Sequence, residues 1–218
     1  MKPFEKHFLC ILFALVAMVP AGAQSMREVW LSMPDSLVGY LNKSKRIEAM
    51  DYRDMGLKLD VRNLLKGSTL VDTLTADFIS VKLNKSASLQ MKLLPRESDT
   101  LVCVVKTFRG PAADSSISFF TTRWQPVGTS MFCDSVSPLA QPVDCFLQRP
   151  DTMSVERFSE LSLQFEPRLL SIEMPVSGEE LSIELQPALP VPSSLAASLK
   201  QLVKRRNFKW NGKMFIEC

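Results

Sequence analysis

Residues 70–127 read LVDTLTADFISVKLNKSASLQMKLLPRESDTLVCVVKTFRGPAADSSISFFTTRWQPV and decide the fold, because they hold most of the strand signal in the chain. Three successive runs place apolar residues at every second position, and the runs are separated by Asn, Ser, Pro, Asp and Gly. This pattern predicts an antiparallel meander whose strands each bury one side. The alternating positions are Ile79, Val81 and Leu83, then Leu89, Met91 and Leu93, then Leu101, Cys103 and Val105. We therefore expect a sheet with one apolar and one more polar face, and the flanking segments are the candidates to cover it.

The segment before the meander has a helical pattern. Asp35 or Ser36 can cap a short helix, and a second helix should follow Asn42-Lys43-Ser44 and end at Gly56. We expect Ile47, Met50 and Tyr52 to face the core from this second helix. Alternation over residues 57–62 then predicts a strand that opens the sheet.

The segment after the meander predicts a loop, a hairpin, a helix and a second hairpin. Residues 128–150 have no sustained period, and two strand-like runs follow within residues 169–185. A helix should begin at Ser193 or Ser194 and continue to about Arg206. Asn211-Gly212 predicts a terminal hairpin, whose two-residue loop would place Phe208 opposite Phe215.

These elements predict an α+β fold. Antiparallel strands from about residue 57 to residue 124 would be extended by the two C-terminal hairpins, with helices packed on one face. The alternative is a mostly-β sandwich with peripheral helices. Residues 24–128 and 129–218 form either one continuous domain or two smaller ones, because a chain of this length permits both.

The N-terminus predicts export. Lys2 and Lys6 precede an apolar run over residues 8–19, and Ala21-Gly22-Ala23 supplies small residues for cleavage. Residues 1–23 therefore have the features of a secretory signal peptide, and the run is shorter than the roughly 20 residues that span a bilayer. Removal of this segment leaves a net charge of +2, which does not favour a nucleic-acid partner. No later segment predicts a membrane span, so we expect a soluble protein of the periplasm or outer cell envelope.

Histidine use limits the chemistry. The one histidine is His7, which leaves with the signal peptide, so histidine-based nucleophilic catalysis and imidazole metal sites are excluded from the mature chain. No glycine-rich phosphate loop occurs, and we expect no cofactor and no metal. The pair Glu179-Glu180 is typical of a solvated turn, and Ser198 and Lys200 do not share a helix face. No catalytic residues are predicted.

Four cysteines follow the signal peptide, and an even number in an exported chain favours disulfides over metal binding. Cys133 and Cys145 bracket a proline-bearing loop and form the best local pair, against the alternative of unpaired thiols. Cys103 is in phase with apolar neighbours and is predicted to be a core residue.

A basic cluster follows the predicted C-terminal helix. Two interpretations apply: cations that offset the helix dipole, or a contact patch for an anionic envelope component or an acidic partner. Its members are Lys200, Lys204, Arg205, Arg206 and Lys209, which Lys43, Lys45 and Arg46 would extend if the fold brought them together.

Several motifs give the chain a family resemblance. Through MPDSL (33–37), DTLTADF (72–78), MKLLP (91–95) and FFTTRW (119–124) it resembles a Bacteroidales family of secreted proteins that carry a domain of unknown function. The resemblance implies an envelope or secreted location and no activity.

One recurring tripeptide has both a structural and a functional interpretation. Asp followed by Ser or Thr and an aliphatic residue is ordinary turn and cap chemistry. The resemblance adds that exported proteins of this bacterial group are O-glycosylated at such tripeptides. The acceptor oxygens would lie on Ser36, Thr73, Thr100, Ser135 and Thr152.

We therefore expect an exported envelope protein that acts as a non-enzymatic binding or structural module. The alternative is a histidine-free hydrolase that uses carboxylate or Ser/Lys chemistry. An envelope protein or glycan is the expected kind of partner. A concave pocket with convergent carboxylates would favour the enzyme, and an exposed patch suffices for the binding module.

Overall fold

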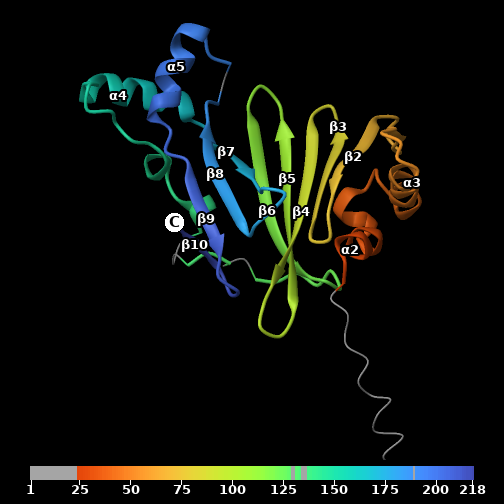
Figure 1. The fold of residues 1–218 in the computed structure, drawn as a ribbon. Helices are drawn as coiled ribbons and strands as arrows, with labels where there is room; N and C mark the ends of the chain where they lie inside the picture. Colours follow the sequence, from red (N-terminus) through yellow and green to blue (C-terminus); the bar gives the residue numbers. More distant parts are fainter. Residues whose placement is uncertain (1–23, 129–130, 134–136, 189) are drawn as a thin grey trace, which may run out of the picture.

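The structure, a computed structural model, describes residues 24–128, 131–133, 137–188 and 190–218. It contains two antiparallel sheets and flanking helices, which confirms the α+β class (Figure 1). The first sheet has six strands in sequence order: β1 (Val61–Arg62), β2 (Ser68–Leu74), β3 (Phe78–Asn84), β4 (Ala87–Pro95), β5 (Thr100–Arg109) and β6 (Ala113–Thr121). The second has four strands in the order β10-β9-β8-β7: β7 (Leu169–Glu173), β8 (Glu180–Gln186), β9 (Arg206–Trp210) and β10 (Phe215–Glu217).

The first sheet has one apolar face beneath the N-terminal helices, and its other face is buried around β5 but polar along β3 and the first half of β4. Met91 pairs with Ile79 and with Val104, and these three contribute to a core beneath the N-terminal helices. Cys103 and its neighbours Leu101 and Val105 face the other way, into a core shared with the second sheet. The expected division into an apolar and a more polar face holds along β3 and β4, but not at β5, which reads LVCVV without polar positions. Both of its sides are therefore buried.

Two helices cover one face of the first sheet, α2 (Met26–Ser32) and α3 (Lys43–Asp54) (Figure 1). Helix α2 was not predicted, although Ser25 and Glu28 form a capping box at its start. Residues Asp35–Val38 form a 3₁₀ turn, η1. In α3 the buried side chains include Met50, but Ile47 is exposed, and Arg46 is buried in the core instead.

The strand predicted over residues 57–62 is reduced to Val61–Arg62, which pair with Thr69 and Ser68. The alternating residues Leu57 and Leu59 are exposed and unpaired with β2. Alternation alone therefore does not make residues 57–60 a strand. They follow shortly after α3, and no neighbouring strand pairs with their backbone.

The C-terminal hairpins form their own sheet, so the expectation that they extend the meander was wrong. The open edge of β7 lies against the first sheet. No backbone ladder joins β7 to that sheet, and side chains of β6 and β4 accept hydrogen bonds from the backbone of β7 and of the residue after it instead. The backbone N–H of Leu170 donates to Asp114 (3.2 Å), that of Ile172 to Ser115 (3.1 Å) and that of Met174 to Gln90 (3.2 Å). Because β7 approaches in this way, the second sheet stands away from the first and leaves a cleft beside the junction.

The terminal hairpin differs from the prediction in its register. Trp210 pairs with Phe215, and Phe208 pairs with Glu217. Asn211 explains the longer loop, since its side-chain oxygen accepts from the backbone N–H groups of Lys213 and Met214. An Asx turn therefore replaces the two-residue loop, with Gly212 at φ +91°.

The other elements cover the second sheet. They are η2 (Pro138–Ala140), η3 (Val143–Phe146), α4 (Val155–Ser162), η4 (Leu163–Phe165) and α5 (Ser193–Leu202). Helix α5 was expected, and Leu199 and Leu202 pack into the shared core. Helix α4 was not expected, although Ser154 caps it by accepting from the backbone N–H of Arg157.

Candidate binding cleft

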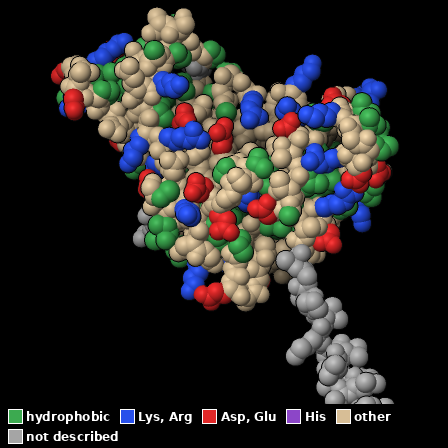
Figure 2. All heavy atoms as spheres, viewed as in Figure 1, with side chains coloured by type: hydrophobic (Ala, Val, Ile, Leu, Met, Phe, Trp, Pro, Cys, Tyr) green, Lys and Arg blue, Asp and Glu red, His purple; other side chains and the backbone are tan. Residues whose placement is uncertain are grey.

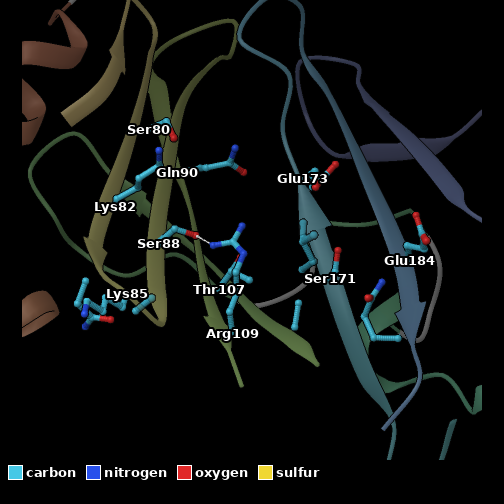
Figure 3. Close-up of a pocket in the computed structure, with 15 residues that line it drawn as sticks. Ser80, Lys82, Lys85, Ser88, Gln90, Thr107, Arg109, Ser171, Glu173 and Glu184 are labelled. Carbon is cyan, nitrogen blue, oxygen red and sulfur yellow. Dashed lines mark hydrogen bonds between the residues drawn. The ribbon is translucent and has the colours of Figure 1, made fainter. Parts of the chain in front are cut away.

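A cleft of about 620 Å³ lies between the two sheets, beside the junction of β6 and β7. One wall is the face of the first sheet that points away from α2 and α3, and the other is a face of β7 and β8 (Figure 3). The first wall includes Ser80, Lys82, Ser88, Gln90, Thr107 and Arg109, and the second Ser171, Glu173, Glu184 and Gln186.

Strand register explains why the first wall is polar. Ser80 pairs with Gln90, and Ser88 pairs with both Lys82 and Thr107, so these side chains share one face. The residues between them, such as Val81 and Leu89, point to the helices. The alternation in the sequence therefore builds an apolar core on one side and a wall of hydrogen-bonding groups on the other.

Gln90 joins the two walls. Its amide accepts from the backbone N–H of Met174 at 3.2 Å and donates to the carbonyl of the same residue at 3.5 Å. Two residues further along β4, the buried Lys92 donates to the carbonyl of Val176 at 2.8 Å and pairs with Asp77 at 2.9 Å. These contacts hold the end of β7 against β4 and fix the width of the cleft.

The charges of the cleft are divided between its walls. Lys82 and Arg109 lie on strands of the first sheet and Lys85 in the turn between β3 and β4, whereas Glu173 and Glu184 lie on the second sheet. Figure 3 shows Gln90 and Arg109 reaching toward the space that Ser171 and Glu173 line from the other side. Among the described residues, no ion pair joins the two walls. Figure 2 shows cationic and anionic side chains on this face of the molecule.

The charged side chains have only weak or local partners. Lys82 is 3.7 Å from Asp72, on the neighbouring strand β2, and Arg109 donates to Ser88 Oγ at 2.6 Å. Glu173 lies 3.3 Å from Arg205. A second depression, of about 290 Å³, shares Glu173 with the cleft and continues past Arg205 and Asn207. The polar surface therefore extends along the second sheet.

Two arrangements in the cleft resemble catalytic pairs. Lys82 lies directly across from Ser88, but its side chain is 64% exposed, whereas a lysine that acts as a base is desolvated. Glu173 and Glu184 are diagonal neighbours on adjacent strands, a separation of roughly 7–8 Å. The Glu173 side chain is 65% exposed, so it lacks the burial that makes a carboxyl a general acid at neutral pH.

The structure divides the predicted basic patch. Lys200, Lys204, Arg205 and Lys209 are exposed, but Arg206 is 6% exposed and pairs with Glu217. This guanidinium lies against the rings of Phe146 and Phe208. Arg46, which would have extended the patch, is buried as well. Strand alternation turns Arg206 inward, so that the five cations do not share a surface.

The thiols of Cys133 and Cys145 are free and exposed, and that of Cys103 is buried. The structure therefore contains no bridge between Cys133 and Cys145, and its formation on oxidation stays a prediction. Burial raises the pKa of the Cys103 thiol. This thiol is therefore protonated and acts as a small core side chain.

The acceptors for glycosylation differ in exposure. Ser36 and Thr152 are exposed, in η1 and in a turn respectively. Thr73 and Thr100 are half-buried, within β2 and at the start of β5. Ser135 lies outside the described residues. Exposure therefore favours Ser36 and Thr152 over Thr73 and Thr100.

Sequence analysis missed every residue of the cleft. The polar residues that alternate with the apolar ones in β3 and β4 could have indicated the cleft. The same pattern, however, is typical of a sheet face that points to solvent. In the described part of the chain, no cluster of His, Cys, Asp or Glu side chains is arranged to hold a metal ion. None of the described helices is long and apolar enough to cross a membrane.

Comparison with known proteins supports the fold and the family. A solved structure of a domain of an uncharacterized protein from Porphyromonas gingivalis W83 is similar, with a TM-score of 0.69 at 21% identity. The match covers 90% of this chain and 98% of that one, and at this identity it shows the fold alone. No curated protein matches. The model of a family described as "Protein of unknown function (DUF3256)" matches residues 18–215, which include both sheets. The chain therefore belongs to this family, as the motifs in its sequence indicated.

Proposed function

We propose that the protein is a non-enzymatic binding module and that the cleft between the two sheets is its ligand site. The single observation that carries the proposal is the division of charge across the cleft: cations on one wall and carboxylates on the other, without an ion pair between them in the described chain. Charged groups that face each other without pairing are available to a third partner.

The size and lining of the cleft support binding. Its volume of about 620 Å³ lies within the range of roughly 300–1,000 Å³ that is typical of small-molecule sites. Its lining is rich in hydroxyl and amide groups, which orient a polar ligand through hydrogen bonds. The contacts of Gln90 and Lys92 hold the walls apart, so that the site is preformed.

A panel of polar ligands tests the proposal. Short peptides, oligosaccharides and amino sugars would be titrated into ¹⁵N-labelled protein, and backbone amide shifts would be recorded. We expect a ligand whose shifts cluster on β3, β4, β7 and β8. Ser88→Trp and Ser171→Trp, one from each wall, should abolish these shifts because each fills the cleft, whereas Ser116→Trp on β6 should not. Shifts that lie elsewhere, or survive both cleft variants, would refute the site.

The diagonal pair Glu173 and Glu184 favours a second candidate, a hydrolase that uses two carboxylates. This reaction requires one carboxyl to be desolvated when substrate binds. Hydrolysis of a panel glycan that is lost in both Glu173→Gln and Glu184→Gln would favour the enzyme. Binding that is followed by recovery of the intact ligand favours the binding module.

We also propose that the mature protein is exported and glycosylated, on the basis of its signal peptide and its tripeptides. A glycan is bulky and hydrated, so it requires an exposed acceptor. Intact-mass measurement on protein from its native host should show excess mass over residues 24–218. Ser36→Ala and Thr152→Ala should each remove one increment, and Thr73→Ala none. A native mass equal to that of the bare chain would leave turn chemistry as the explanation of the tripeptides.

A further inference from the structure

We infer that the cleft selects a short peptide with free ends, whose carboxylate lies against Arg109 and whose ammonium lies against Glu184 and Glu173. This inference rests on the proposed function and names the ligand class of the same site.

The charges favour a ligand of both signs. A purely anionic ligand would meet Glu173 and Glu184 across the cleft, and a purely cationic one would meet Lys82, Lys85 and Arg109. A ligand that carries one charge of each sign at opposite ends matches both walls at once. A peptide with free termini is the simplest such molecule, because its terminal charges are separated by the length of its backbone.

The charged side chains also have hydrogen-bond donors and acceptors that no described residue uses. The side chain of Arg109 has five N–H donors, and within the described residues it donates one hydrogen bond, to Ser88. Its planar guanidinium can hold a carboxylate with two parallel hydrogen bonds. Neither Lys85 nor Glu184 has a side-chain partner within the described parts of the chain. Binding of a zwitterion to Arg109 and Glu184 therefore breaks no existing ion pair, whereas its contact with Glu173 competes with Arg205 at 3.3 Å.

The uncharged groups suit a peptide backbone. Ser80, Ser171 and Gln186 line the cleft, and their side chains make no hydrogen bond to another described residue. They offer both donors and acceptors to peptide N–H and C=O groups. Gln90 and Thr107, by contrast, are already bonded to Met174 and Ser115 and serve as supports.

The lining disfavours ligands that bind by stacking. None of the residues that line the cleft is Phe, Tyr or Trp. An aromatic ring would be expected beneath a nucleobase, and likewise beneath the apolar face of a sugar. The volume of about 620 Å³ accommodates a drug-sized ligand, which corresponds to a peptide of a few residues.

Four forms of tetraalanine test the inference, since they differ only in their terminal charges. The peptide with both ends free, the N-acetylated form, the C-amidated form and the doubly blocked form would be titrated into the ¹⁵N-labelled full chain from Gln24. We expect the free peptide to shift cleft amides, and each blocked end to weaken binding about tenfold or more, because one charge-assisted hydrogen bond is lost.

Two variants assign each end of the peptide to its wall. Arg109→Gln should weaken binding of the free peptide about tenfold, but should leave the C-amidated form unchanged. Glu184→Gln should weaken binding of the free peptide, but should leave the N-acetylated form unchanged. Arg123→Gln, an exposed arginine outside the cleft lining, is the matched control and should have no effect. Backbone amide spectra of each variant confirm that it folds.

Four results would overturn the inference. Equal binding of all four peptides would show that the terminal charges are not recognised, and an effect of Arg109→Gln on the C-amidated form would remove its assigned role. If an oligosaccharide shifts the cleft amides and no peptide does, the ligand class is wrong but the proposed binding function stands. If no ligand of either class shifts these amides, both proposals fail together.

Discussion

Replacing Arg46 with methionine is expected to lower the free energy of unfolding by about 2–5 kcal/mol. The Arg46 side chain is 1% exposed, and its guanidinium donates to the carbonyls of Leu41 (2.8 Å) and Met33, and to Asp35 (2.8 Å). Methionine fills similar space but donates nothing. Two buried carbonyls would therefore lose a donor, at a cost of about 1–3 kcal/mol each.

Urea unfolding, followed by tryptophan fluorescence, measures the effect of Arg46→Met. Lys45→Met on the same helix is the matched control, since Lys45 forms a half-exposed pair with Glu48 at 2.8 Å. Such pairs contribute at most about 1 kcal/mol. If Arg46→Met costs no more than Lys45→Met, the guanidinium does not secure the segment between α2 and α3.

Replacing Lys92 with methionine is expected to cost about 1–3 kcal/mol and to loosen the cleft wall. The Lys92 side chain is 2% exposed and donates to the carbonyl of Val176, in the turn between β7 and β8. Asp77, its ionic partner, is about half exposed and regains water when the lysine is removed, which limits the cost. The turn keeps its contact between Met174 and Gln90 but loses the side-chain bond that holds its middle, at Val176, to the first sheet.

Hydrogen exchange tests this second prediction locally. Amide protection should fall across residues 174–180 in Lys92→Met, and should remain unchanged in Lys82→Met, an exposed lysine on the adjacent strand. Unchanged exchange in the turn of Lys92→Met would show that the hydrophobic core alone holds the second sheet in place.

The Lys92 contact should also depend on pH. Partial burial opposes ionisation of Asp77, but hydrogen bonds from Lys92 and Thr75, together with the lysine charge, lower the pKa of this carboxyl. Stability that comes from a lowered pKa is present above the unfolded value of about 4 and is lost as the pH falls through the folded value. The difference in stability between wild type and Lys92→Met should therefore shrink below about pH 4, as measured by unfolding across pH.

The sequence predicted the meander well because its strands are local in sequence and have a clear period of two. Its faces were harder to predict, since Leu101–Val105 is apolar at every position. Arg46, Lys92 and Arg206 are charged residues that the sequence does not distinguish from surface cations. Each is buried because carbonyls or carboxylates from distant segments reach it.

The cleft could not be predicted for a related reason. Ser80, Ser88 and Gln90 have the spacing of a wet sheet face, and nothing near them indicates that β7 packs there. The contact between Gln90 and Met174 joins a side chain to a backbone group across a separation of 84 residues. Such a contact leaves no periodic pattern in either segment, whereas a backbone ladder requires two strands of matching alternation.

The way β7 meets the first sheet also bears on aggregation. An open strand edge is a template for pairing with other chains. The N–H groups of β7 are occupied by Asp114, Ser115 and Gln90, so this edge offers fewer donors to a second molecule. The edge of β6 is covered in part by Val127, whose backbone N–H donates to the carbonyl of Phe119.

Strand β1, in contrast, covers only Ser68 and Thr69 of β2, beside the exposed Leu57 and Leu59. Self-association in concentrated solution is therefore expected to begin at β2, and Leu59→Lys should suppress it in light-scattering measurements.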